Sequence, residues 1–181
     1  MERMHEPVEE MLLGDRELSR SAGLRSVCAT RVARVLQERG LHAALAFLNE
    51  RTRYRFTGLY QADPPVLRNV GLFDRENPRI DVSGAVTKLD ETYCAITAST
   101  AAPFSVQDAR SDQRLVTHAA RDSVLCYAGV PIRLGNGRAW GSLCHFDMRP
   151  RLLVREELDI LASVAEVMPE WLASRPVLEG D

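Results

Sequence analysis

Cysteines are the side chains of this sequence with the greatest capacity for chemistry, and the chain has Cys28, Cys94, Cys126 and Cys144. They lie far apart and form no Cys-x-x-Cys pair, which argues against a zinc site or a redox pair at the level of the sequence. Buried free thiols are the simplest interpretation. Cys94 and Cys126 would nevertheless suit a thiol sensor or a thiol enzyme if both faced one pocket.

His118 lies on a short helix predicted to roof a pocket, and His145 lies on a predicted central strand. Either side chain could titrate near neutrality or bind a haem iron or a metal. Neither has a second histidine, cysteine or carboxylate at ligand spacing beside it, so a structural role is preferred. Asp108 and Asp147 each follow a predicted strand and are expected to accept backbone hydrogen bonds in the turn.

The composition is that of an ordinary globular domain. The chain has 181 residues, of which 45% are hydrophobic and 27% charged, with a net charge of −2. This length predicts a single domain, and the composition excludes disordered and fibrous proteins. Acidic and basic residues alternate, so no basic field exists to attract nucleic acid. No apolar run approaches a bilayer span or a signal peptide, which predicts a cytoplasmic protein without a membrane partner.

Two helices are predicted to precede any strand. Apolar residues recur at helical spacing over 24–35, the pattern stops at Gly40, and a second helical stretch covers 41–48. Residues 1–23 are polar and weakly periodic, so we expect a frayed lead or a short helix there.

A last helix is predicted from about Val154 to Met168, where Pro169 should end or kink it. Two apolar stripes run along this helix, so one is expected to pack on a sheet and the other on the N-terminal helices or a second subunit. The predicted organisation is a lead over 1–23, one domain over 24–172 and a tail over 173–181.

The strongest strand signal is a hairpin over 125–134 and 139–146, joined by an Asn136-Gly137 step that provides positive φ angles. Both strands are apolar almost throughout, so helices should cover both faces of the sheet. Gly129 and Gly141 lie inside these strands, where glycine marks a bulge or a close approach.

Further strands are predicted as an antiparallel pair over 54–60 and 66–73 and a short strand over 104–106. Two short helices are also predicted. The first covers 89–97 and has a capping-box-like start at Thr87 and Asp90, and the second covers 113–121 with Asp112 as a cap.

Four segments in this order resemble bacterial GAF domains of signalling proteins: 90–95 (DETYCA), 103–110 (PFSVQDAR), 127–132 (YAGVPI) and 141–147 (GSLCHFD) followed by 149–151 (RPR). The resemblance covers about residues 24–172. It implies an α/β (α+β) fold with a central antiparallel sheet of five or six strands, terminal helices on one face, and short helices and loops that roof a pocket on the other.

The segments from 82 to 121 are expected to form this roof, because they are short and rich in Ala, Ser and Thr and pack less densely than the terminal helices. Arg121 is expected to be the only fixed cation of the pocket. The predicted ligand-binding residues are Tyr93, Cys94, Thr97, Phe104, Val106, His118, Arg121 and Tyr127.

Three functions remain open at the level of the sequence. The first hypothesis is a non-catalytic sensor or regulatory domain that binds an unidentified small molecule, forms a homodimer through its terminal helices and acts through a signalling partner. The alternatives are a thiol-dependent enzyme of the free methionine sulfoxide reductase type and a dimerisation scaffold without ligand. No metal is predicted, and the sequence does not identify a cofactor. A bilin would require a Cys-His pair that the resemblance does not place here, and the cysteine pattern of the reductases is not found.

Overall fold

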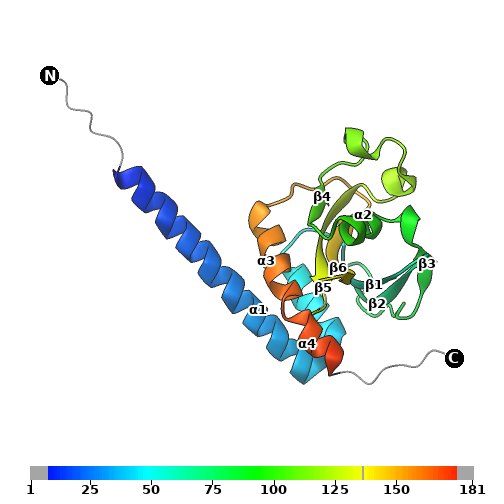
Figure 1. Cartoon of the computed structure of the whole chain (residues 1–181), viewed down its shortest axis with the longest axis horizontal. Helices are drawn as coiled ribbons and strands as arrows, with labels where there is room; N and C mark the ends of the chain where they lie inside the picture. The colour runs from blue at the N-terminus through cyan, green and yellow to red at the C-terminus, as the bar shows by residue number, and fades with distance from the viewer. Residues whose placement is uncertain (1–7, 136, 175–181) are drawn as a thin grey trace.

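A six-stranded antiparallel sheet forms the centre of the computed structural model, which describes residues 8–135 and 137–174 (Figure 1). The strands are β1 (Phe56–Asp63), β2 (Val66–Asp74), β3 (Val86–Lys88), β4 (Phe104–Val106), β5 (Cys126–Arg133) and β6 (Ala139–Asp147). Their order in the sheet is β3-β2-β1-β6-β5-β4. Strands from the two halves of the chain therefore meet at the centre of the sheet.

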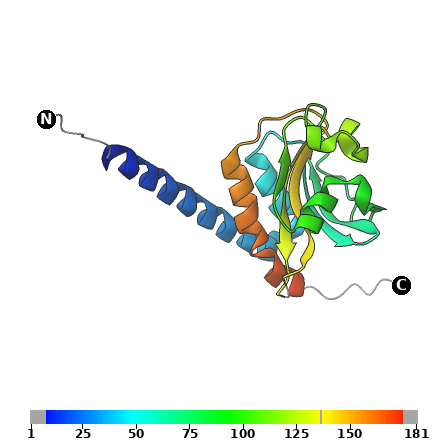
Figure 2. The same cartoon turned by 45° about the horizontal axis from the view of Figure 1, so that its top comes forward.

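The terminal helices cover one face of this sheet (Figure 2). They are α1 (Val8–Glu50), α3 (Arg155–Ala165) and α4 (Met168–Ala173). Gly40, with φ 81° and ψ 179°, breaks the helical path of α1 at the predicted position. The break between α3 and α4 precedes Pro169, which occupies the first turn of α4, where a missing N–H costs nothing.

Short elements cover the opposite face: the helix α2 (Tyr93–Thr100) and the 3₁₀ helices η1 (Leu89–Glu91), η2 (Gln113–Leu115) and η3 (Ala119–Asp122). The sheet thus separates two cores. Leu59, Leu143 and Val130 pack with the terminal helices, whereas Tyr127 and Cys144 pack with the roof. The predicted α+β fold, with terminal helices on one face and a roof of short elements on the other, is confirmed.

Three local predictions differ from the structure. Helix α1 already begins at Val8, so residues 8–22 continue a 43-residue helix instead of forming a lead or a short helix. The capping box at Thr87 and Asp90 does not form, because Thr87 lies in the edge strand β3 and the longer helix starts only at Tyr93. The predicted helix over 113–121 is two separate 3₁₀ turns, the first of them capped by Asp112 as predicted.

Gly137 has the positive φ, 78°, that the hairpin requires, and residue 136 lies outside the described residues. Within the described ranges, none of the helices combines the length and the apolar character that crossing a bilayer demands.

Candidate functional site

A cavity of about 180 Å³ lies between the roof and the sheet. Strands β1, β5 and β6 form its floor, while β3, η1, α2 and η3 surround it. The residues that line it are Tyr60, Leu67, Thr87, Glu91, Thr92, Tyr93, Cys94, Ala120, Ser123, Val124, Tyr127, Cys144 and Phe146. A concave, mostly apolar hollow with a few polar groups is the usual form of a small-molecule site.

Glycines shape the floor of this cavity. A Cβ atom on Gly129 would lie 2.1 Å from the Tyr127 hydroxyl oxygen, and one on Gly58 would lie 2.5 Å from Cε2 of Tyr60. Each tyrosine ring therefore lies across the glycine two residues away on its strand instead of standing upright. Any larger residue at these glycines would push the ring into the cavity.

The Cys94 thiol lies at the junction of roof and floor. Its Sγ accepts a hydrogen bond from the Tyr127 hydroxyl at 3.5 Å, and Thr97 Oγ1 lies 3.3 Å from the same hydroxyl. A hydrogen bond from the Cys144 thiol lowers the pKa of Cys94, which outweighs the opposite effect of burial. Burial raises the pKa of Cys144 well above its ordinary value. Among the four cysteines, Cys94 is thus the one whose environment favours the thiolate.

Cys126 does not face this cavity. It is buried on the other face of the sheet beside Tyr54 and Ala128, and its thiol donates to the Arg151 carbonyl at 3.5 Å. The sheet therefore separates Cys126 from Cys94, and the nearer thiol is Cys144, which sequence reasoning left out. Alternation along β6 could have found it, because Cys144 and Phe146 share one side of that strand and His145 lies on the other.

The structure brings the predicted site residues together only in part. Tyr93, Cys94 and Tyr127 line the cavity. Phe104 lies behind them, with ring centroids 6.0 Å from Tyr93 and 6.1 Å from Tyr127, and Val106 belongs to the same buried cluster. Burial raises the pKa of Tyr93 to about 12, so this phenol stays neutral.

His118 and Arg121 lie outside the lining. The His118 ring packs on Tyr93 at 4.7 Å, and its Nδ1 accepts the Ala120 N–H at 3.1 Å. Burial lowers the pKa of His118. The Arg121 guanidinium donates to the Arg110 carbonyl and pairs with Asp122. Arg121 is therefore not part of the lining that the sequence analysis expected, but it lies close enough to Tyr93 for its charge to oppose the burial that raises the pKa of that phenol.

His145 lies in the other core. Thr57 Oγ1 is 2.7 Å from its Nδ1 and also accepts from Asn49 Nδ2 at 2.8 Å. Its Nε2 faces Glu157 Oε1 at 3.5 Å. This placement supports the structural role preferred for His145. Within the described ranges, no cluster of three or more His, Cys, Asp or Glu residues that could hold a metal ion occurs.

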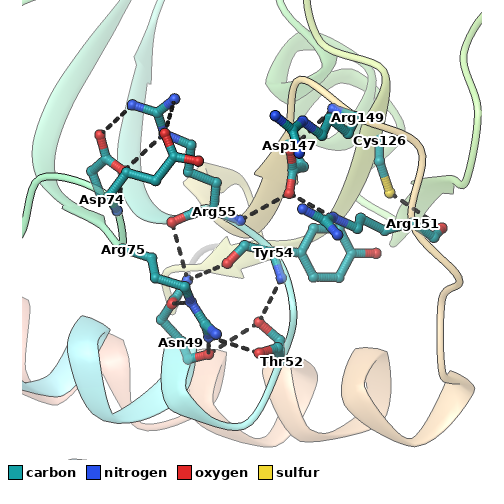
Figure 3. Close-up of polar contacts among 11 residues, drawn as sticks. Asn49, Thr52, Tyr54, Arg55, Asp74, Arg75, Cys126, Asp147, Arg149 and Arg151 are labelled. Atoms are coloured by element: carbon teal, nitrogen blue, oxygen red, sulfur yellow. Dashed lines mark hydrogen bonds and ion pairs between the residues drawn. The ribbon is translucent and has the colours of Figure 1, made fainter.

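A larger groove of about 850 Å³ lies at the start of α3. Two of the three arginines that line it are engaged with carboxylates, since Arg51 pairs with Glu157 at 3.7 Å and Arg151 pairs with Asp147 at 2.7 Å. Figure 3 shows that Asp147 lies at the centre of a polar cluster that ties β6 to the loops on either side. This groove is built from structural ion pairs, so we assign the site to the roofed cavity.

A model of the GAF domain family matches residues 23–168. This chain belongs to the GAF domain family. No curated protein sequence matches it. The match covers all six strands, α2, α3 and most of the packed part of α1, so the roofed cavity lies inside the GAF domain.

Solved structures of GAF domains share the fold at low sequence identity. The GAF domain of a phosphoenolpyruvate-protein phosphotransferase from Acinetobacter matches with a TM-score of 0.65 and 11% identity over 83% of this chain and 93% of that chain. A putative GAF sensor protein from Burkholderia vietnamiensis matches with a TM-score of 0.62 and 17% identity over 86% and 99%. A free methionine-R-sulfoxide reductase from Neisseria meningitidis, solved with its substrate, matches with a TM-score of 0.63 and 14% identity over 84% and 90%. At these identities the likeness shows the fold alone.

Proposed function

We propose that this GAF domain is a non-catalytic sensor that binds a small molecule in the cavity between roof and sheet and acts through a partner protein. The cavity itself is the observation that supports the proposal most directly. Its floor is a rigid sheet, whereas its roof consists of one eight-residue helix and three 3₁₀ turns. Short elements of this kind open locally at low free-energy cost, so ligand binding can change their order.

The proposed ligand contacts are Tyr93, Cys94 and Tyr127 from the sequence analysis, together with Tyr60, Glu91, Cys144 and Phe146 from the structure. Thr97, Phe104, Val106 and His118 support these side chains from behind. A ligand here would contact β1, β5 and β6 at once, and these strands also pack against the terminal helices on their other face. A change in the strands on ligand binding could therefore reach the terminal helices and, through them, a partner protein.

Native mass spectrometry of protein purified from its own host tests the proposal. We expect a retained small molecule, released on denaturation, in the unmodified chain. The variant Val124→Phe should fill the cavity and lose the molecule, because Val124 is part of the lining. The matched variant Val116→Phe changes a residue that is 56% exposed and outside the lining, so it should keep the molecule. A ligand-free protein would favour a dimerisation scaffold, and retention in both variants would show that the molecule binds outside this cavity.

A thiol enzyme is the second candidate, because one observation favours it: Cys94 lines the cavity with a lowered pKa and has Cys144 beside it. Two thiols can reduce a sulfoxide to a thioether when they become a disulfide and the oxygen leaves as water. The solved neighbours include reductases of free methionine sulfoxide. Burial raises the pKa of Cys144, however, which disfavours it as the resolving thiolate.

We expect no turnover of free methionine sulfoxide by the isolated protein with dithiothreitol as reductant. The measurement is the methionine formed over time, with a reductase as positive control. Turnover that disappears in Cys94→Ser, and survives in Cys28→Ser on the distant α1, would replace the sensor assignment by the enzyme. Turnover that disappears in Cys126→Ser would also contradict the face assignment of that thiol.

A further inference from the structure

The lining of the roofed cavity has an uneven distribution of charge. Four aromatic rings take part in it, from Tyr60, Tyr93, Tyr127 and Phe146. Glu91 supplies the one carboxylate, and among the described residues that line the cavity none is Lys, Arg or His. The aromatic rings and the Glu91 carboxylate therefore present electron-rich groups to a ligand in the cavity.

The rings are arranged around the hollow and are not stacked on one side. Tyr93 and Tyr127 form an edge-to-face pair with centroids 5.6 Å apart and planes at 67°. Tyr60 and Phe146 form a second pair at 6.5 Å and 55°. Because Tyr60 and Tyr127 lie across Gly58 and Gly129, each turns one ring face to the sheet and the other toward the roof. A group above the floor therefore meets π faces, which carry partial negative charge.

Two further groups strengthen the negative potential. Cys94 Sγ accepts the Tyr127 hydroxyl, and its lowered pKa favours the thiolate. The Glu91 carboxylate is half exposed at the edge of the cavity, where Lys88 Nζ binds it at 3.0 Å. The cations Lys88 and Arg121 lie near the cavity but outside its lining: Lys88 pairs with Glu91, and the charge of Arg121 opposes the burial that raises the pKa of Tyr93. A thiolate inside would thus be a buried charge without a partner in the lining, which is costly.

We propose that the cavity binds a small organic cation of the quaternary ammonium class. This inference rests on the proposed sensor function and names its ligand class. Aromatic rings attract such cations through their faces and do not require hydrogen bonds from them. A volume of about 180 Å³ suits a ligand of roughly six to eight non-hydrogen atoms, since a cavity of about 150 Å³ holds benzene. Choline is of this size, whereas a nucleotide or a tetrapyrrole is not.

Calorimetric titration of the full chain tests the class, with choline as the cation and 3,3-dimethylbutan-1-ol as its neutral isostere. We expect choline to bind about tenfold more tightly than the alcohol, the scale of a desolvated cation–π interaction. Glu91→Gln should weaken choline binding about threefold, and Asp90→Asn, which removes a carboxylate next to it but outside the lining, should not. Equal affinity for choline and the alcohol, or no choline binding, overturns the proposal.

The main result of a second measurement is obtained on the unmodified chain. The N-methyl proton resonances of bound choline should shift upfield in the NMR spectrum, because ring currents shield groups above aromatic faces. Tyr60→Leu, checked for folding by circular dichroism, should reduce both this shift and the affinity. An unshifted resonance at saturation overturns the cation class. The sensor function is judged separately, since a neutral or anionic molecule retained in native mass spectrometry would support the sensor and refute the cation.

Discussion

The Asp147 carboxylate shows how one side chain at the end of a strand organises its surroundings. It accepts the Arg55 N–H at 3.1 Å and the Arg149 N–H at 3.0 Å, and Arg151 Nε at 2.7 Å (Figure 3). The first bond joins β6 to the segment before β1, and the other two fold the loop that leads to α3. The predicted role of Asp147 as a turn acceptor is confirmed, and its contact with Arg55 extends that role across the sheet.

Asp147→Ala should lower the free energy of unfolding by about 2 to 4 kcal/mol, because two N–H groups and a guanidinium lose a shared buried acceptor. Urea unfolding followed by circular dichroism measures this change. The control is Asp108→Ala, where the carboxylate accepts only the Arg110 N–H at 3.1 Å. We expect a loss below about 1 kcal/mol there. Equal effects of the two substitutions would contradict the central role of Asp147.

The roof shows how short elements depend on single polar contacts. Helix α2 has no side-chain cap at Thr92, whereas η3 starts with His118 accepting the Ala120 N–H. This acceptor exists only while the imidazole is neutral. Burial lowers the pKa of His118 below its ordinary value of 6.5, so protonation must oppose the folded roof.

The sign of the pH effect follows from this lowered pKa. The contribution of His118 to stability is complete above pH 6.5 and is lost as the pH falls through the lower pKa of the folded state. We expect an NMR titration of the His118 ring to give an apparent pKa below 6.5. His118→Gln keeps an acceptor that does not titrate, so it should flatten the stability profile in this range. His42→Gln, on α1 far from the roof, should leave that profile unchanged, and a flat profile in the unmodified chain would contradict the prediction.

The sequence pattern predicted an element well where the side chains of that element are buried. The strands 126–133 and 139–147 carry apolar residues on both faces, and the break at Gly40 has the glycine that a positive φ requires. Strand β3 was missed because Val86, Thr87 and Lys88 are all exposed, so burial leaves no pattern in its sequence. The start of α1 was missed because residues 8–22 show no apolar periodicity, which is the signal from which a helix is predicted.

The sequence analysis placed the cavity on the correct helix and strands, but it did not identify all of the residues that line it. Position on α2 and β5 placed Tyr93, Cys94 and Tyr127 correctly on the roof and the floor. Arg121 could not be placed, because the direction of a long side chain on a 3₁₀ turn depends on local acceptors such as the Arg110 carbonyl. Cys144 and Tyr60 come from strands that are distant in sequence and become neighbours only through the order of the sheet.

The whole molecule is a GAF domain from which the first part of α1 projects as a rod (Figures 1 and 2). The C-terminal apolar stripes are covered within the chain, since Ile160, Leu161 and Val164 are fully buried. Exposed apolar side chains also occur on α1, where Leu24 is 37% and Val27 is 54% exposed just before the buried Cys28. A single helix without packing is marginal in water. A second copy of the chain is therefore the partner that we propose for it.

Light scattering at tens of micromolar should give the mass of a homodimer. Val27→Glu should shift the protein to the monomer, because it places a charge on the exposed apolar part of the rod. Ser26→Glu adds the same charge one residue earlier, about 100° around the helix, and should leave the dimer intact. A monomer in the unmodified protein, or equal effects of the two glutamates, would refute dimerisation through this helix.

The pairing of β1 with β6 at the centre of the sheet also sets the order of events during synthesis. Phe56 pairs with Phe146, so about 90 residues separate the two strands in sequence. The hairpin of β1 and β2 can form as soon as it leaves the ribosome, but the free edge of β1 stays open until residue 147 has been made. During that interval the packed part of α1, which includes Val32, Leu45 and Leu48 and precedes both strands in the chain, is available to cover the apolar face of the β1–β2 hairpin.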